Sequence, residues 1–177
     1  MHASEWRWDK MNRIVVYTSN TGFTRKYAEW IAEELDCEAV ELKRADLSAI
    51  DSYDQVIYGG WVMGNIVSGY EKIKDAGIKD LIVFCSGISV PTDTVKETIA
   101  KQNGIRKDRL FCFEGGYNPA KVGFMGKMMI KMIAGSLRRK KDKTTEDLHM
   151  LATVNGADHT DRAAIAPLIE AAKEKMP

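Results

Sequence analysis

Short apolar runs alternate with longer amphipathic stretches along most of the chain. The short runs are rich in β-branched and aromatic residues, and near-continuous apolar runs of this length predict strands that are buried on both faces of a sheet. Five segments fit this description: Arg13–Tyr17, Glu38–Leu42, Gln55–Gly59, Leu81–Cys85 and Leu110–Phe113. The second run is more polar than the others, which indicates a strand at an edge of the sheet.

The stretches between these runs predict helices. Phe23, Tyr27, Ile31 and Leu35 recur at a spacing of four, which gathers them on one face of a helix. Three further helices are expected: at 93–101 with Thr92 or Asp93 as the N-cap, at about 122–139, and at 165–172, where Pro167 places the regular part late.

Strands that alternate with helices imply right-handed βαβ units and a parallel sheet covered on both faces. We therefore expect an α/β fold, with a doubly wound five-stranded parallel sheet in one domain at 13–177 and an N-terminal tail at 1–12. In such sheets, ligands bind beyond the carboxyl ends of the strands. The segments 18–24, 60–65 and 86–93 follow three of the predicted strands and should meet at one rim.

The composition of the 177 residues is that of a globular protein. It is 45% hydrophobic and 29% charged, which excludes a disordered or low-complexity chain. No apolar run approaches the roughly 18 residues that a membrane-spanning helix needs, and the N-terminus lacks the apolar core of a secretory signal. Three widely spaced cysteines without a CxxC pair favour a reduced, cytoplasmic setting. His149 and His159 have no neighbours at metal-ligand spacing, so no metal site is expected.

Charge is unevenly distributed along the chain, although the net charge is +1. The stretch 117–143 contains eight basic residues and one acidic residue, a local charge of +7, so the remainder of the chain carries −6. Such asymmetry indicates a polyanionic partner. Few aromatic residues are interleaved with these charges, which disfavours nucleic acid and favours an anionic membrane surface.

The segment after the first strand has the composition of an anion-binding loop. Ser19, Thr21 and Thr24 can donate hydroxyl hydrogen bonds, and Asn20 can donate from its amide. Gly22 allows the backbone to approach an anion closely at the point where a helix begins. The same residues also fit a hydroxyl-rich helix cap. The chain has no GxxxxGK(S/T) motif and no GxGxxG motif, which excludes a P-loop nucleotidase and a dinucleotide turn.

This loop and its flanks resemble the N-terminal signature of the flavodoxin family. The matching positions are Val15, Val16, Tyr17, Ser19, Gly22, Thr24, Ala28 and Ile31. Over about 12–175 the chain is similar to flavodoxin-domain proteins akin to the bacterial menaquinone-dependent protoporphyrinogen dehydrogenase. That wider resemblance is carried by the Gly-Gly-x-Val-x-Gly turn after the third strand and by the basic, Met- and Phe-containing segment before the last helix.

The resemblance implies a flavodoxin-like strand order, 2-1-3-4-5, and FMN as the cofactor. The loop from Ser19 to Thr24 would hold the 5′-phosphate, and the second and third rim loops would flank the isoalloxazine ring, with Trp61 and Met63 as candidate ring contacts. The cofactor-binding residues implied in this way are Ser19, Asn20, Thr21, Gly22, Phe23, Thr24, Gly60, Trp61, Val62, Met63, Gly64, Ser86, Gly87, Ile88 and Ser89.

The expected function is that of an FMN-binding oxidoreductase or electron-transfer protein, and the resemblance suggests the protoporphyrinogen dehydrogenase type. Because the flavin would carry the redox chemistry, no catalytic side chain is expected. Two alternatives are an electron carrier without a substrate of its own and a flavodoxin-fold binding module that lacks flavin. The expected partner is a small molecule or a redox protein.

The helix expected at 122–139 has more apolar surface than a helix that covers a sheet needs. Lys127, Lys131 and Arg138 fall in one narrow arc, and apolar side chains occupy most of the remaining circumference. That combination is typical of a helix on an anionic membrane, which would bring a flavin near a lipid-soluble acceptor such as a quinone. We therefore expect peripheral attachment to the inner membrane face through 121–143. The methionines equally fit a core or a dimer interface, and the sequence leaves the oligomeric state open.

Overall fold

The computed structural model describes residues 11–174. Residues 1–10 of the predicted tail lie outside this range, as do residues 175–177. Within the described residues, no helix is both long enough and apolar enough to cross a membrane.

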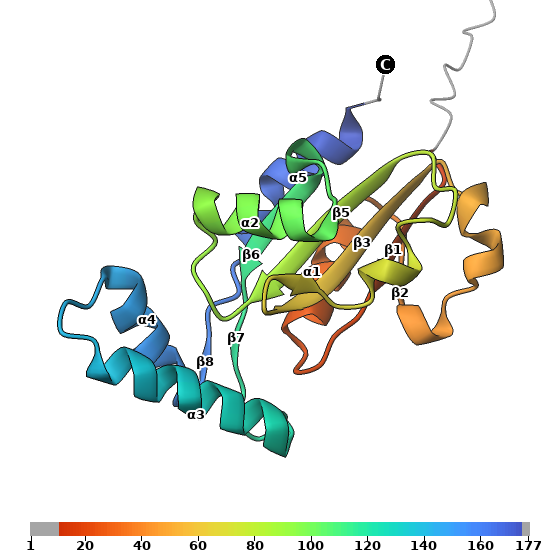
Figure 1. The fold of residues 1–177 in the computed structure, drawn as a ribbon. Helices are drawn as coiled ribbons and strands as arrows, with labels where there is room; N and C mark the ends of the chain where they lie inside the picture. The colour runs from red at the N-terminus through yellow and green to blue at the C-terminus, as the bar shows by residue number, and fades with distance from the viewer. Residues whose placement is uncertain (1–10, 175–177) are drawn as a thin grey trace, which may run out of the picture.

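A parallel sheet of five strands forms the centre of the molecule (Figure 1). Its strands are β1 (Arg13–Tyr17), β2 (Glu38–Glu41), β3 (Gln55–Met63), β5 (Leu81–Gly87) and β6 (Leu110–Glu114). They pair in the order β2-β1-β3-β5-β6, with the polar β2 at one edge. Counted along the chain, this is the order 2-1-3-4-5 over five parallel strands, which confirms the predicted α/β fold.

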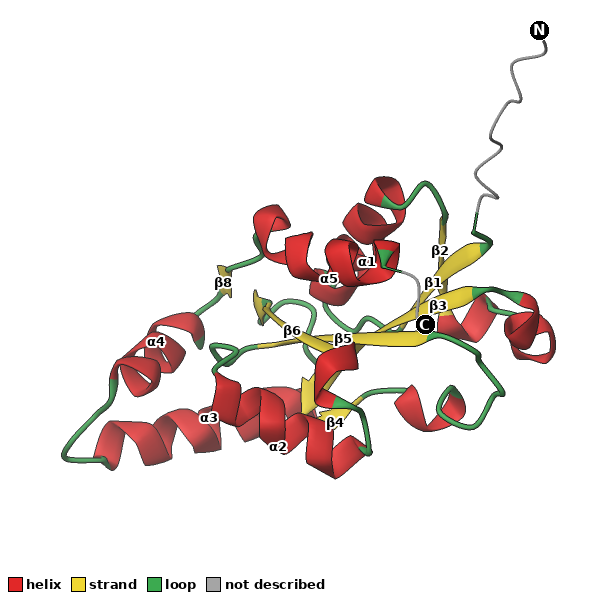
Figure 2. Ribbon diagram, turned by 90° about the horizontal axis from the view of Figure 1, so that it is seen from above, coloured by secondary structure: helices red, strands yellow, loops and turns green. Residues whose placement is uncertain are grey.

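Helices cover both faces of the sheet, as Figure 2 shows. On one face lie α1 (Phe23–Glu34) and α5 (Ala166–Lys173), and on the other lie α2 (Asp93–Asn103) and the 3-10 helices Leu47–Ser52 and Tyr70–Lys72. The strands divide their side chains between two cores because successive residues point to opposite faces. In β1, Val15 packs with the α1 and α5 side, whereas Val16 packs with the α2 side.

The helix caps agree with the sequence in α2 and differ in detail elsewhere. The Thr92 hydroxyl accepts a hydrogen bond from the Val95 amide at 3.3 Å, so Thr92 is the N-cap of the two predicted candidates. The helix predicted at about 122–139 is α3, and it begins at Phe124 and ends at Arg139. The last helix is preceded by a 3-10 turn at Arg162–Ile165 that Asp161 caps.

The chain after β6 leaves the sheet. A two-stranded antiparallel ribbon pairs β7 (Gly116–Tyr117) with β8 (Ala157–Asp158), and between them the chain forms α3 and then α4 (Thr145–Thr153). In Figure 1, α3 lies beyond the strand ends and not against the sheet, and Ala134 is its buried residue. Helix α4 was not expected from the sequence, although the capping box formed by Thr144 and Asp147 is a local signal for its start.

The third strand is longer than predicted, which corrects the expected loop at 60–65. Strand β3 continues through Met63, and a two-residue turn at Gly64 and Asn65 leads into the antiparallel β4 (Ile66–Val67). Both turn residues have positive φ, +58° and +66°, as the type I′ turns of β-hairpins require. Trp61 therefore still pairs with Ser86 in the parallel sheet, whereas Met63 lies on the antiparallel ribbon that β3 forms with β4.

Candidate functional site

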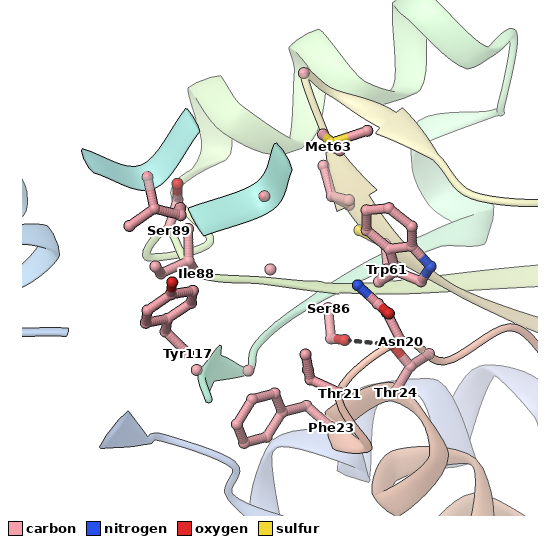
Figure 3. A pocket seen from close by; sticks show the side chains of 18 of the residues that line it. Asn20, Thr21, Phe23, Thr24, Trp61, Met63, Ser86, Ile88, Ser89 and Tyr117 are labelled. Atoms are coloured by element: carbon pink, nitrogen blue, oxygen red, sulfur yellow. Dashed lines mark hydrogen bonds between the residues drawn. The ribbon is translucent and has the colours of Figure 1, made fainter. Parts of the chain in front are cut away.

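A pocket of about 530 Å³ lies at the carboxyl edge of the sheet, between the rim segments and α3. Its volume is within the range of small-molecule sites. The three predicted rim segments meet there, and Figure 3 shows their side chains around one space. The predicted residues that line the pocket are Asn20, Thr21, Phe23, Thr24, Trp61, Val62, Met63, Gly64, Ser86, Gly87, Ile88 and Ser89.

Three predicted residues support the pocket wall without lining it. The Ser19 hydroxyl accepts a hydrogen bond from the Gly22 amide at 3.1 Å, which closes the loop on itself. Gly22 has φ +102°, a left-handed conformation that disfavours any residue with a side chain. Gly60 packs against the hairpin, where an added Cβ would lie 2.6 Å from Val67 Cγ1.

The loop leaves the first turn of α1 without a side-chain cap, which favours the anion-site interpretation of its hydroxyl groups over the helix-cap interpretation. Gly22 is the N-cap, no side chain caps the helix, and the first turn holds no acidic residue. The first amides of a helix have no partner within the helix and stand at the positive end of its dipole. Since the loop does not satisfy them itself, it has the properties of an anion site and not of a side-chain cap.

The buried hydroxyl pair of Thr24 and Ser86 connects the first rim loop to the third. The two oxygen atoms lie 2.8 Å apart, and Figure 3 marks this bond. Because each hydroxyl has one proton, one of the two is donated within the pair. The Thr24 hydroxyl is therefore used in a hydrogen bond between two parts of the protein. The Thr21 hydroxyl makes no such bond among the described residues, so it is the loop threonine that remains available to a ligand.

Tyr58 holds the start of the loop in place from within the sheet. Its hydroxyl lies 3.0 Å from Thr18 Oγ1 and donates to the Ser68 carbonyl at 2.6 Å. Burial of the side chain raises the pKa of Tyr58 to about 12. The phenol is therefore neutral at physiological pH and acts as a fixed hydrogen-bonding group.

Lys121 is a functional candidate that the loop motif did not reveal. Its Nζ lies 3.7 Å from the position that a Cβ on Gly22 would occupy. In the sequence this lysine belongs to the basic stretch 117–143, and nothing local connects it to a loop about a hundred residues earlier. The fold brings its positive charge next to the loop that follows β1.

Trp61 lies closer to the loop than Met63 does. Figure 3 shows the indole ring beside Asn20, whereas Met63 lies farther out along the ribbon, and 48% of Met63 is exposed. At the third rim segment, Gly87 does not have a positive φ, and a Cβ added to it would clash with no protein atom. The nearest atom to that Cβ would be Val62 Cβ, at 3.7 Å. A flat ligand would thus find an aromatic side chain and an open backbone around the pocket.

Several lining residues were not predicted as site residues. Tyr117 comes from β7, and Cys85, Cys112, Val95 and Ile99 come from the sheet and α2. The far wall is apolar and is provided mainly by α3, through Met125, Met129, Ile130 and Ile133. In the sequence, the surplus apolar surface of the helix predicted at about 122–139 was the signal for this wall. It did not show which face of the helix would line a pocket.

A family model described as a flavodoxin domain matches residues 14–145, more than half of the chain. The chain belongs to the flavodoxin-domain family. The match spans β1 and its loop, the hairpin, the third rim segment and α3.

Solved structures similar to this flavodoxin domain include a flavodoxin from the domain Archaea, with 15% identity and a TM-score of 0.44 over 63% of this chain and 88% of that one. Flavodoxin 2 from Bacillus cereus has 22% identity and a TM-score of 0.42 over 58% and 84% of the two chains. A WrbA-like flavodoxin from Agrobacterium tumefaciens has 17% identity and a TM-score of 0.45 over 82% and 94%. Among curated proteins, no sequence matches this chain significantly.

Two cysteines of this flavodoxin domain lie side by side at the pocket. Cys85 on β5 and Cys112 on β6 are register partners, and the Cys85 thiol donates to Cys112 Sγ at 3.3 Å. This hydrogen bond lowers the pKa of Cys112, because it stabilises the thiolate. The same bond, together with burial, raises the pKa of Cys85 well above its usual value.

We predict that Cys112 is alkylated at a lower pH than Cys85. The pH midpoint of the alkylation rate at Cys112, followed by peptide mass spectrometry, should lie below that of an ordinary cysteine thiol and should rise in Cys85→Ala, which removes the donor. The pH midpoint is the informative quantity, because a change in how easily the reagent reaches Cys112 alters the alkylation rate and not its pH midpoint. An unchanged or lower midpoint in Cys85→Ala would contradict this assignment.

Proposed function

We propose that this chain is an FMN-binding oxidoreductase. The observation that carries the proposal is the open N-terminus of α1 at Gly22, beside Lys121, on one side of an apolar pocket at the carboxyl edge of the sheet. The residues fit a flavin mononucleotide, which has one phosphate and one flat, largely apolar ring system. When bound, FMN would supply the electron-transfer chemistry, and the protein would bind and orient it and tune its electronic properties.

The phosphate end of the cofactor would be held by the loop after β1. The amides at the start of α1 and the Thr21 hydroxyl are hydrogen-bond donors, and Lys121 adds a positive charge. A single anion site of this kind suits a mononucleotide. The absence of a dinucleotide glycine motif from the sequence supports FMN over FAD or NAD.

The ring end would lie between Trp61 and the third rim segment. Gly87 is connected to the end of β6 by the hydrogen bond from the Gly115 amide to the Gly87 carbonyl at 2.7 Å, so its backbone is held in place. Across the pocket, the apolar side chains of α3 would limit the access of water to the ring. That wall offers room for an apolar organic substrate, which favours an enzyme over an electron carrier without a substrate.

The protoporphyrinogen dehydrogenase type is the finer form of this proposal. It is supported by the sequence resemblance over about 12–175, and an apolar wall suits the apolar ring system of such a substrate. The departure lies in the basic stretch 134–145, whose composition differs from the acidic, Thr- and Gly-rich segment expected in such proteins.

We further propose that α3 contacts an anionic membrane surface. Phe124, Met128 and Met132 form a stripe at a spacing of four that faces solvent, with exposed fractions of 77%, 48% and 68%. These three side chains are therefore not part of the core of this chain. The basic run from Arg138 to Lys141 follows directly in the sequence. Its positive charge is complementary to anionic lipid, which supports a membrane surface as the partner of α3.

The first prediction of the proposal concerns FMN affinity. Purified protein should bind FMN and quench its fluorescence, and the variants Thr21→Ala and Lys121→Gln should each weaken binding by about tenfold or more, since a hydrogen bond to a charged group contributes about 1.5–3 kcal/mol. Thr98→Ala on α2 is the matched control, because its hydroxyl bonds to the Thr94 carbonyl. Protein that stays colourless and fails to quench FMN fluorescence would refute the proposal.

A second prediction separates the enzyme from the carrier. FMN-loaded protein should oxidise protoporphyrinogen over many turnovers with a menaquinone analogue as acceptor. Met129→Gln puts a polar group in the pocket wall and should lower kcat/KM by about fivefold, the effect of about 1 kcal/mol of lost apolar contact. Met128→Gln on the solvent-facing stripe should leave kcat/KM unchanged. Electron exchange with redox proteins without substrate turnover would favour the carrier.

A third prediction tests the membrane contact. Vesicles with increasing anionic lipid should pellet the protein at low salt, and changing Arg138, Arg139, Lys140 and Lys141 to glutamine should reduce pelleting at least tenfold, since each basic residue contributes about 1 kcal/mol near the surface. The charge-matched control changes Lys43, Arg44, Lys72 and Lys74 to glutamine. Wild-type protein that does not pellet with any vesicle would refute the contact.

A further inference from the structure

Three chemistry-bearing side chains that are far apart in the sequence meet beside the small β7–β8 ribbon. Glu114 lies at the end of β6, His149 on α4, and His159 directly after β8. One potential ligand atom from each residue lies within 4.8 Å of the other two. His149 Nε2 contacts Glu114 Oε1, and the centroids of the two imidazole rings are 4.6 Å apart. All three residues are half-buried.

The backbone holds these residues in place. The His159 amide donates to the Gly115 carbonyl at 2.8 Å, which fixes His159 next to the residue that follows Glu114. Glu114 is itself anchored through its carbonyl, which accepts a hydrogen bond from the Tyr27 hydroxyl at 2.7 Å. The cluster is therefore built on paired strands and a helix and not on an unsupported loop.

A buried hydroxyl sets the tautomer of His159. Thr153 is fully buried, and its Oγ1 donates its one proton to the His149 carbonyl at 2.9 Å. The same oxygen lies 3.0 Å from His159 Nε2, so it accepts the Nε2–H proton there. The lone pair of the His159 ring is then on Nδ1. An imidazole that donates one N–H to an outer partner and keeps the other nitrogen for a metal is the usual arrangement in metal sites.

The donor set selects the class of cation. Two imidazoles and one carboxylate are ligands of Zn²⁺ in sites that keep a fourth position open, whereas Ca²⁺ and Mg²⁺ prefer oxygen ligands throughout. Zn–ligand bonds of about 2.0–2.2 Å place tetrahedral ligand atoms roughly 3.4 Å apart. Rotations of these half-exposed side chains can bring atoms that now lie within 4.8 Å to that spacing.

We propose that Glu114, His149 and His159 form a binding site for one divalent transition-metal ion, with Zn²⁺ as the best fit. The ion would connect α4 and the segment after β8 to the end of β6. Because Met150 of α4 and the neighbouring α3 line the pocket, the ion would also stabilise the pocket wall. The site is distinct from the proposed flavin site and does not depend on flavin being bound.

The test is a titration of chelator-treated protein with Zn²⁺ by calorimetry and with Co²⁺ by visible absorption. All samples carry His2→Gln, because His2 is the one histidine of the sequence outside the cluster and could bind a metal by itself. We expect one ion per chain at micromolar protein and a rise in Tm with Zn²⁺. Glu114→Gln, His149→Gln and His159→Gln should each weaken binding by a hundredfold or more.

Glu146→Gln is the matched control, because Glu146 is an exposed carboxylate on the same helix as His149. It should leave the affinity and the Tm shift unchanged. If circular dichroism shows that the histidine variants fail to fold, the proposal is tested by the titration of the parent protein and of the near-isosteric Glu114→Gln variant. A parent protein that takes up no stoichiometric Zn²⁺, or an affinity that survives all three ligand substitutions, would overturn the proposal.

Discussion

The hydrogen bond between the hydroxyls of Thr24 and Ser86 is the contact on which the geometry of the pocket depends. It joins the first turn of α1 to the end of β5, so the loop at 18–24 and the third rim segment keep a fixed separation. Parallel pairing of β1, β3 and β5 brings the two hydroxyls to the same edge of the sheet. The bond is buried, and an unpaired hydroxyl in its place would cost about 1–3 kcal/mol. The scaffold thus fixes the relative position of these two segments.

The segment after β6 leaves the sheet and forms one wall of the pocket. Because α3 does not pack on the sheet, its apolar residues are divided between the pocket wall and the solvent-facing stripe of Phe124, Met128 and Met132. Helix α3 contributes little buried surface of its own, since Ala134 is its one fully buried residue. The β7–β8 ribbon and α4 therefore have to position it, and the Glu114, His149 and His159 cluster lies where these elements return to the sheet.

Tyr27 connects the two regions. Its ring is buried in the core beneath α1, and its hydroxyl donates to the Glu114 carbonyl and accepts from the Asp161 amide at 3.1 Å. The end of β6 and the approach to α5 are thereby attached to the same helix that begins at the loop at 18–24. The Glu114, His149 and His159 cluster and the loop at 18–24 are thus both connected to α1.

The sequence by itself determined the five parallel strands, α1, α2 and the residues of the first loop, because these depend on local periodicity and on residue types at adjacent positions. It also indicated α3, whose apolar residues exceed what a sheet-covering helix needs. Tertiary structure alone decided the extension of β3 into a hairpin, the approach of Lys121 to Gly22, and the meeting of Glu114 with His149 and His159. Each of these depends on pairing or packing between segments that are distant in the chain, or on a turn too short to produce a periodic pattern. Two-residue strands such as β7 and β8 have no detectable alternation, so the elements that bring the histidines together could be found only in the folded molecule.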